Sequence, residues 1–415
     1  MRVDNIMKTK RTLLVALVGS LTVVACQGFL EVTNPGPIAD SSLLTPDAVP
    51  SLVTGMSSDF SNNYDEIVRL TSIAADESAH GGSYAGEGLW VRGIIRAEDV
   101  NTHWSGSHQV RFESESGIER MKGMKGFSYE TSAQAARANM FAGLSNRTLG
   151  ENFCEAVFNN GPAQPGTEYF VRAEKYFTEA IRVAQAATGA SDILNASYAG
   201  RAAVRAAQGN WTGAVADAAL VPATFVYVAP FSTNSTRENN SLVQETYVRR
   251  EFSVFGTQWA QVFKDPRVPW DTIKTTTGAI QKGQDGLTNY FRQAKYKDLG
   301  ADIPIAKGTE MLMLRAENAL RASDIGGAFA FLNQARVVAA MTPLTVPSDL
   351  ASAWVTLQKE RGATLWLEGR RLWDLRRWNV ETGPSHSSFL DGRDKCIPIG
   401  LAELQTNPNL RSRLP

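Results

Sequence analysis

Residues 356–378 read Thr-Leu-Gln-Lys-Glu-Arg-Gly-Ala-Thr-Leu-Trp-Leu-Glu-Gly-Arg-Arg-Leu-Trp-Asp-Leu-Arg-Arg-Trp, and this stretch has the most regular pattern in the chain. Leu365 and Leu372 are seven residues apart, as are Trp366 and Trp373. On a helix, residues at this spacing lie nearly on one line. The pattern therefore predicts one continuous scaffold helix, packed through its leucines and tryptophans.

The charged side chains of this stretch also fall at helical spacing. Glu368 with Arg371, Arg370 with Asp374, and Asp374 with Arg377 are three or four residues apart, which allows a ladder of ion pairs. Exposed pairs of this kind contribute only tenths of a kcal/mol. Partly buried against tryptophan rings, the guanidinium groups would also stack on them. The stretch is therefore interpreted as structural and not as a binding site.

Helical periodicity continues upstream, where helices follow one another in pairs. Glu168–Thr188 carries an apolar stripe at i, i+3/i+4 and i+7, and two further helices follow it. Glu310–Arg321 and Ala328–Ala340 form another pair across a short turn. Helix, turn and helix with paired small residues resemble tetratricopeptide units. We therefore predict a mainly α fold, with tetratricopeptide-like hairpins near 168–220 and 310–341 as its scaffold.

Two long regions have no sustained period. Residues 78–128 are rich in Gly, Ser, His and Trp, and residues 222–305 contain clusters of Pro, Asn and Thr. Irregular chain of this length is uncommon inside a compact protein and usually forms a functional surface or a mobile segment. We expect both regions to be loop-rich insertions in a helical domain over 51–415.

The N-terminus has the pattern of an export signal. Basic residues precede an apolar run from Leu13 to Ala25, which ends at Cys26. The run is shorter than the ~20 residues that span a bilayer. With cysteine at the break, it resembles a bacterial lipobox, which implies a signal peptide over 1–25, a lipid on Cys26 and a tether over 26–50. The alternative is a plain secretory signal that happens to end at a cysteine.

The residue after the cysteine bears on the final location. Gln27 occupies the position where Asp would oppose onward transport in lipoproteins of this type. The resemblance therefore implies sorting to the outer membrane.

The charge balance argues against nucleic-acid binding. The 415 residues include 42 basic and 42 acidic side chains, and loss of residues 1–25 would leave 38 and 41. No basic stripe is present, so binding to a phosphate backbone has no electrostatic support. A hydrophobic content of 43% is that of an ordinary globular protein.

Two cysteines remain if Cys26 is lipidated. Cys154 and Cys396 would then form one pair in an oxidising compartment. We favour a disulfide between them, which would close a very long loop and contribute up to ~4–5 kcal/mol in the chain-entropy model. Two buried free thiols are the alternative.

A sugar-binding surface needs flat aromatic rings with amides, carboxylates or arginine beside them. Aromatic rings in polar, irregular sequence are more often exposed than those on a helix stripe, although each can equally serve local packing. Trp259 and Trp270 are second-rank candidates, and Trp211, Trp366 and Trp373 are assigned to the core. The first-rank candidates come from residues 64–104: Tyr64, Tyr84, Trp90, Arg92, Asn101 and Trp104.

Motifs for catalysis or metal binding are not found. The chain has no nucleophile elbow, phosphate loop or His-Glu-x-x-His pattern. His103 and His108 are five residues apart and would not share a helix face, which argues against zinc. Asp76 and Glu77 are adjacent, so on a helix they would diverge by ~100° and would rarely flank one glycosidic bond. We expect no catalytic residue, no metal and no cofactor.

The stretch quoted first also resembles the signature helix of the SusD/RagB lipoproteins. The similarity is carried by Glu360-Arg361, by Leu367-Glu368-Gly369-Arg370-Arg371 and by Trp373-Asp374-Leu375-Arg376-Arg377-Trp378. Other matching pieces occur in the expected order along the whole chain. They are Cys26-Gln27-Gly28-Phe29-Leu30-Glu31-Val32, Leu314-Arg315-Ala316-Glu317, Pro398-Ile399 with Glu403-Leu404, and Asn407-Pro408-Asn409-Leu410.

This resemblance implies a function as well as a fold. Such lipoproteins sit on the outer face of the outer membrane as hinged lids over a SusC-like, TonB-dependent β-barrel, and they capture glycans or sometimes peptides. Residues 80–125 are idiosyncratic, so the family implies no particular ligand residue here. Two alternatives stay open: a partner of the same fold that gates a barrel without binding ligand, and a surface glycan hydrolase.

Overall fold

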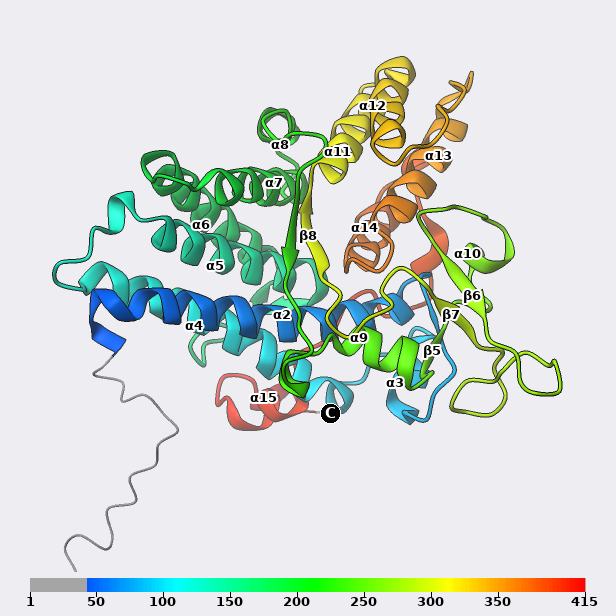
Figure 1. The fold of residues 1–415 in the computed structure, drawn as a ribbon, viewed down its shortest axis with the longest axis horizontal. Coiled ribbons are helices and arrows are strands. Elements are labelled where there is room, and N and C mark those ends of the chain that lie inside the picture. The colour runs from blue at the N-terminus through cyan, green and yellow to red at the C-terminus, as the bar shows by residue number, and fades with distance from the viewer. Residues whose placement is uncertain (1–42, 415) are drawn as a thin grey trace, which may run out of the picture. The chain divides into compact units, whose positions relative to one another are not determined.

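The computed structural model describes residues 43–414, and helices make up most of the body that begins at Thr45 (Figure 1). The predicted signal peptide, Cys26 and most of the predicted tether lie outside the described residues. The mainly α fold predicted from the sequence is confirmed. The longer helices are α2 (Val49–Ala74), α4 (Asn101–Gly123), α5 (Ala133–Asn152), α6 (Thr167–Ala186), α7 (Ser191–Ala207), α8 (Trp211–Ala218), α11 (Gly308–Arg321), α12 (Ile325–Val338), α13 (Leu350–Thr364) and α14 (Arg371–Asn379). Shorter helices are α3 (Ala85–Trp90), α9 (Ser241–Val243), α10 (Gln258–Gln261) and α15 (Leu401–Thr406).

The strands are short and pair in antiparallel ribbons of two. The pairs are β1 (Ala79–His80) with β5 (Phe252–Ser253), β2 (Glu155–Ala156) with β3 (Gln164–Pro165), β4 (Val226–Ala229) with β8 (Ile303–Lys307), and β6 (Trp270–Thr272) with β7 (Phe291–Gln293). The register of β4 on β8 shifts between Tyr227 and Val228. Because β8 runs directly into α11, this ribbon joins the two sets of helical hairpins.

Consecutive helices pack as antiparallel neighbours in the two regions where hairpins were predicted. α5, α6, α7 and α8 form one stack, and α11 packs on α12 (Figure 1). Glycines permit the close approach, since a Cβ atom on Gly200 would lie only 2.3 Å from the ring of Phe177. Side chains cap the N-termini of α8 and α12. Asn210 accepts a hydrogen bond from the Gly213 amide at 3.0 Å, and Asp324 accepts one from the Gly327 amide at 2.8 Å.

The prediction of a loop-rich region over 78–128 is wrong for its second half, where α4 is a helix of 23 residues. The buried face of α4 has the spacing of a helix, but small or polar residues occupy several of its positions, among them Ser107, Ser114 and Gly117. A Cβ atom on Gly117 would lie 2.1 Å from the terminal methyl group of Met56 on α2. The face of α4 that packs closely on α2 therefore lacks the continuous apolar stripe that a periodicity search detects.

Residues 222–305 contain strands β4 to β8 and only short helical segments. These segments are α9, α10, the 3-10 turn η5 (Thr236–Glu238) and the π-helical turn η6 (Gln244–Val248).

The single helix predicted over 356–378 is also wrong, because α13 ends at Thr364 and α14 begins at Arg371. Leu367 and Gly369, between the two helices, have φ angles of 53° and 67°. This left-handed backbone cannot continue a right-handed helix, and glycine adopts it without steric cost. The turn therefore changes which side chains of residues 356–378, here called the signature stretch, lie near one another.

Only one pair of the predicted ion-pair ladder forms, between Asp374 and Arg377 at 3.0 Å. Glu368 instead binds two lysines, Lys295 at 2.6 Å and Lys307 at 2.8 Å. The turn breaks the register that would have brought Glu368 to Arg371 on one helix.

The arginines of the signature stretch reach carboxylates on other elements. Arg370 binds Glu151 of α5 at 2.5 Å, and Arg371 binds Asp76 at 2.7 Å. Arg377 reaches Glu317 of α11 at 2.6 Å. All three carboxylates are largely or fully buried, so these arginines tie α14 to the rest of the helical body.

Candidate functional site

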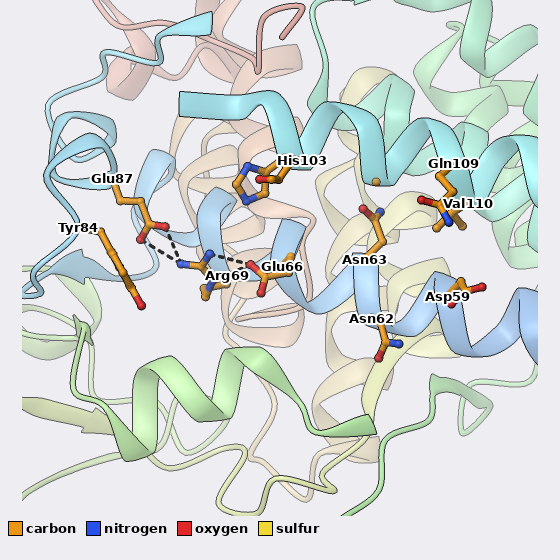
Figure 2. Close-up of a pocket in the computed structure, with 12 residues that line it drawn as sticks. Asp59, Asn62, Asn63, Glu66, Arg69, Tyr84, Glu87, His103, Gln109 and Val110 are labelled. Carbon is orange, nitrogen blue, oxygen red and sulfur yellow. Dashed lines mark hydrogen bonds and ion pairs between the residues drawn. The ribbon is translucent and has the colours of Figure 1, made fainter. Parts of the chain in front are cut away.

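A polar cleft of about 540 Å³ opens between α2, α3 and α4 (Figure 2). The chain forms it because α2 has two different faces. Phe60, Tyr64 and Ile67 are buried in the core, whereas the side chains of the opposite face line the cleft. The lining residues of α2 are three or four positions apart, so they share one side of the helix: Asp59, Asn62, Asn63, Glu66 and Arg69.

The other walls come from α4 and from the segment that leads into α3. α4 contributes Thr102, His103, Gly106, Gln109 and Val110. Gly106 allows this helix to pass close to α2, because a Cβ atom there would lie 3.1 Å from Oδ1 of Asn63. Tyr84 and Glu87 close the end of the cleft near α3 (Figure 2).

Arg69 lies between two glutamates at this end of the cleft. Its guanidinium donates to Glu66 at 2.7 Å and to Glu87 at 2.9 Å. Burial alone would lower the pKa of Arg69, but the two carboxylates raise that pKa above its usual value. The guanidinium therefore remains charged and holds both carboxylates in fixed positions.

The two glutamates have pKa values displaced in opposite directions. Burial would raise the pKa of Glu66, but Arg69 and a hydrogen bond from Ser241 lower it. Burial raises the pKa of Glu87, and Arg69 only partly offsets this effect. Each carboxylate can still accept hydrogen bonds through oxygen lone pairs that Arg69 does not use.

His103 faces the same end of the cleft as a neutral imidazole. Burial lowers the pKa of His103 to about 4, although the negative charge of Glu66 would raise that pKa. Its Nδ1 atom is buried and has no hydrogen-bond partner among the described residues. The ring packs edge-on against Trp90, with 6.4 Å between the ring centroids.

The cleft can recognise a neutral polyhydroxylated molecule. Amides from Asn62, Asn63 and Gln109 both donate and accept hydrogen bonds, and the carboxylates accept them. Tyr84 is half-buried, so part of its ring remains accessible to an apolar face of a ligand. A few polar groups around one ring are typical of small-molecule sites.

The structure separates the six residues that the sequence singled out. Tyr84 lines the cleft, and Asn101 and Trp104 line a second cavity of about 520 Å³ on the other side of α4. Tyr64 and Trp90 are each 1% exposed and Trp104 is 4% exposed, so the expectation that these rings face solvent is wrong. Arg92 is exposed in the turn after α3.

Packing explains why the rings of Tyr64 and Trp90 are not available to a ligand. The Tyr64 hydroxyl donates to the backbone oxygen of Glu368 at 2.6 Å and stabilises the turn before α14. Trp90 ends α3 and packs in a cluster with Ile95 and Leu390.

The second-rank tryptophans are also engaged in packing. Trp259 is 0% exposed, and Trp270 is half-buried and stacks on Phe291.

Sequence reasoning missed most of the cleft. A usable signal existed in the polar stripe at positions 59, 62, 63 and 66, since amides and carboxylates at helical spacing mark one face of a helix. Helical spacing in the sequence is visible from Leu52 to Tyr64, whereas α2 extends to Ala74, so the sequence pattern does not place Glu66 and Arg69 on this helix. The residues of α4 were hidden by the interpretation of that region as loop.

Asp76 and Glu77, which were weighed as a catalytic pair, lie outside the cleft. Asp76 forms a two-pronged ion pair with Arg371, both contacts at 2.7 Å. Glu77 is 1% exposed and accepts a hydrogen bond from the Leu367 amide. The two carboxyl groups therefore have different structural partners.

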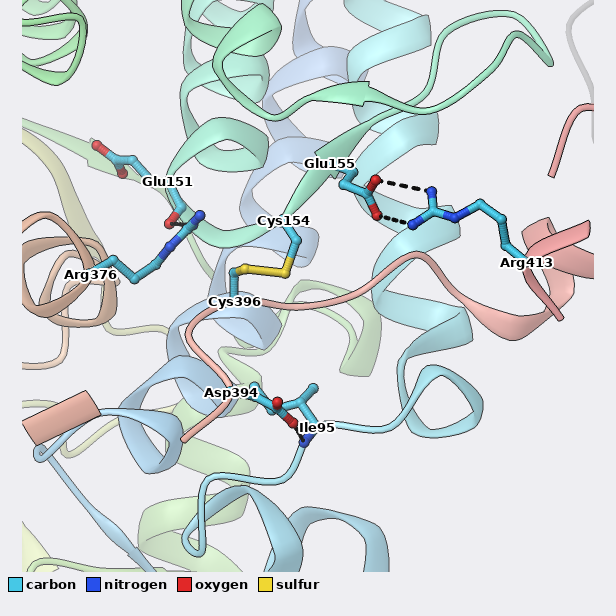
Figure 3. The surroundings of a disulfide bond; sticks show 8 residues. All are labelled: Ile95, Glu151, Cys154, Glu155, Arg376, Asp394, Cys396 and Arg413. Atoms are coloured by element: carbon cyan, nitrogen blue, oxygen red, sulfur yellow. Dashed lines mark hydrogen bonds and ion pairs between the residues drawn. A yellow bond between two sulfur atoms is a disulfide. The ribbon is translucent and has the colours of Figure 1, made fainter. Parts of the chain in front are cut away.

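Cys154 and Cys396 are joined in a disulfide, with 5.2 Å between their Cα atoms (Figure 3). The bond links the segment after α5 to the segment before α15. The adjacent backbone is paired as well, since the Cys154 amide donates to Ile397 at 3.0 Å. Glu155 and Arg413 form an ion pair nearby at 2.7 Å, which further fixes the C-terminal segment.

Among residues 43–414, no cluster of His, Cys, Asp and Glu side chains is arranged to hold a metal ion. Within the same residues, no helix has the length and apolarity needed to span a bilayer.

Comparisons with known proteins agree with the fold described above. Residues 228–409 match the model of the SusD family. No curated protein matches the chain in sequence.

Solved structures resemble most of the chain. A SusD superfamily protein from Bacteroides vulgatus ATCC 8482 is 15% identical with a TM-score of 0.65, covering 88% of this chain and 97% of that one. A SusD/RagB family protein from Bacteroides thetaiotaomicron VPI-5482 is 15% identical with a TM-score of 0.67, covering 88% and 94%. A SusD-like carbohydrate binding protein from B. vulgatus ATCC 8482 is 13% identical with a TM-score of 0.59, covering 80% and 83%. The family-model match confirms the predicted resemblance to the SusD/RagB family over residues 228–409, and the solved structures share the fold of the chain.

Proposed function

We propose that this SusD/RagB family member captures glycans in the cleft between α2, α3 and α4. The observation that carries the proposal is the composition of the cleft, in which amides and carboxylates surround the accessible ring of Tyr84. The similarity to a SusD-like carbohydrate binding protein supports the same ligand class. Peptides are the second ligand class that the family resemblance implies.

We further propose that the protein works at the cell surface as a lid on a SusC-like, TonB-dependent outer-membrane barrel. A lipid on Cys26 would hold it at the outer membrane. The lipobox-like sequence and the family relationship support this arrangement. Capture by the lid would raise the local concentration of ligand at the mouth of the barrel.

Glycan binding is tested with the purified mature protein and a panel of soluble polysaccharides: starch, xylan, glucomannan, pectin and chitosan. Affinity electrophoresis identifies the polysaccharides that retard the protein, and calorimetry with their oligosaccharides gives Kd. Tyr84→Ala and Asn62→Ala should each weaken binding about tenfold, equivalent to ~1.4 kcal/mol.

The matched control is Phe112→Ala. Phe112 is 60% exposed and lines the second cavity, so its removal should leave binding in the cleft unchanged. Loss of binding in the Phe112 variant alone would move the site to the second cavity. Binding of no member of the panel would contradict glycan capture and favour a partner that gates the barrel without ligand.

The barrel partnership is tested separately in the native host. Mild detergent extraction of membranes, followed by purification through a tag on this chain, should recover a TonB-dependent barrel. A Cys26→Ala variant should lose that association, because it would no longer be held at the membrane. Recovery of the wild-type chain without any barrel would contradict the lid role.

A glycan hydrolase is the second candidate, because the pKa values of Glu66 and Glu87 are displaced in opposite directions within the cleft. Both carboxylates bind the same guanidinium of Arg69, however, and a general acid needs a proton free to transfer. Release of new reducing ends from a bound polysaccharide, abolished in Glu87→Gln, would establish the hydrolase.

A further inference from the structure

The cleft does not end at Asp59. A neighbouring cavity of about 680 Å³ continues along α2 toward its N-terminal half, with Val53, Thr54 and Ser58 in its lining. Asp59 and Asn62 line both cavities, so the two spaces meet on the surface of one helix. Figure 2 shows the polar side chains following one another along that side of α2.

We propose that the two cavities form one groove that holds an extended glycan chain lengthwise along α2. From Val53 to Arg69 the helix rises by ~24 Å. Each cavity alone has the size of an ordinary small-ligand site. A ligand that occupies both must therefore be elongated. This inference rests on the proposed glycan capture and adds the shape and length of the ligand.

Each of the two cavities has an aromatic ring in its lining. Tyr84 lines the cleft, and the guanidinium of Arg249 lies 5.4 Å from the centroid of its ring. Phe231 lines the neighbouring cavity of about 680 Å³, where it is half-buried and its backbone amide donates to Asp302 at 2.9 Å. One ring in each cavity suits stacking on two separated sugar units of one chain.

Polar groups occupy the middle of the groove, where the cavities meet. Asp59 contacts Arg237 of η5 at 3.1 Å, and the side chain of Arg237 is 78% exposed. Asp59 also lies against Glu113 of α4, where burial and the neighbouring carboxylate raise the pKa of Glu113. Because the side chain of Arg237 is exposed to solvent, its ion pair with Asp59 contributes little to stability. A ligand can therefore replace it with hydrogen bonds to both side chains.

The groove predicts that affinity depends on chain length. A short oligosaccharide fills one cavity, whereas a long one reaches both rings. Calorimetry with oligosaccharides of two to eight units, prepared from the polysaccharide that binds best in the panel, measures this dependence. Affinity should rise at least tenfold from the shortest chains to the longest and then level off.

Variants at Phe231 and Arg237 test whether the gain in affinity comes from the neighbouring cavity of about 680 Å³. Phe231→Ala should lower the affinity for long chains about tenfold and leave the affinity for short chains unchanged. Tyr84→Ala should weaken binding of both. Phe231 is half-buried, so its removal could also affect folding. Arg237→Ala provides a second variant at an exposed position, and it should lower the affinity for long chains only.

Two outcomes would overturn the groove while leaving glycan capture in place. One is equal affinity at every chain length. The other is long-chain affinity that neither Phe231→Ala nor Arg237→Ala changes, with both variants folded by circular dichroism. Binding of no polysaccharide to the wild-type protein would instead overturn the proposed function itself, together with the groove.

Discussion

The backbone amide of Leu367 donates a hydrogen bond to Oε1 of Glu77 at 2.8 Å, which joins the end of α2 to the turn between α13 and α14. The indole nitrogen of Trp366 donates to the backbone oxygen of Glu77 at 3.3 Å. These two contacts stabilise the turn that divides the signature stretch. Burial raises the pKa of Glu77 to about 8, although the hydrogen bond from Leu367 opposes the shift.

The raised pKa of Glu77 predicts a loss of stability as pH rises. The unfolded chain releases the proton near pH 4.5, whereas the folded protein keeps it until about pH 8. The contribution of Glu77 to stability is therefore complete below pH 4.5 and is lost as pH rises through 8. Glu77→Gln, which keeps the acceptor but cannot ionise, should remove this loss.

Urea unfolding at a series of pH values measures the effect. Between pH 5 and 8 the free energy of unfolding of the wild type should fall relative to Glu77→Gln, by at most ~1.4 kcal/mol per pH unit. Parallel pH profiles for the two proteins would contradict the assignment.

Glu317 of α11 predicts the opposite dependence of stability on pH, with a loss of stability in acid. The residue is 0% exposed and binds Arg377 and Arg321. Burial would raise its pKa, but the two arginines lower it to about 2. Its stabilisation is therefore present above pH 4.5 and is lost as pH falls toward 2. At neutral pH, Glu317→Gln should lower the free energy of unfolding by ~3–5 kcal/mol, since it leaves buried guanidinium groups without a counter-charge.

A matched control is the partly exposed pair of Glu179 and Arg182, whose contact distance is 2.7 Å. Glu179→Gln should lower the free energy of unfolding by less than ~1 kcal/mol, because solvent screens the pair. If urea unfolding gave equal losses for the two variants, the buried network would not have the stabilising role inferred here.

The disulfide predicts a stability that depends on redox state. It closes a loop with a sequence separation of 242 residues. The double variant Cys154→Ser/Cys396→Ser should lose ~2–5 kcal/mol in denaturant unfolding. Dithiothreitol should destabilise the wild type and have no effect on the variant. Thiol counting on denatured, non-reduced mature protein should find neither cysteine reactive.

The proposed lipidation of Cys26 is tested by incorporation of labelled fatty acid in the host. The wild-type chain should be labelled and found in the membrane fraction. Cys26→Ala should abolish both, because no thiol remains to carry the acyl chain. A variant that is still labelled would show that the lipid is attached elsewhere.

The sequence was least informative where small or polar residues take part in helix packing. α4 was missed because Ser107, Ser114 and Gly117 form part of its buried face, and a search for apolar periodicity does not detect them. Trp90 illustrates the reverse error, because polar neighbours suggested an exposed ring, yet the indole is buried. In both cases burial depended on what α2 and the C-terminal segments pack against, which no local pattern contains.

The mainly α fold and the resemblance to the SusD/RagB family can be recognised from the sequence, because helical periodicity and the pattern of residues 356–378 are local properties of the chain. Only tertiary contacts explain why residues 356–378 turn at Leu367 and why the polar face of α2 lines two adjoining cavities. The turn needs Glu77 and Lys295, which come from distant segments and satisfy its polar backbone groups. These cavities need α4 and η5 beside α2, and only folding brings these elements together.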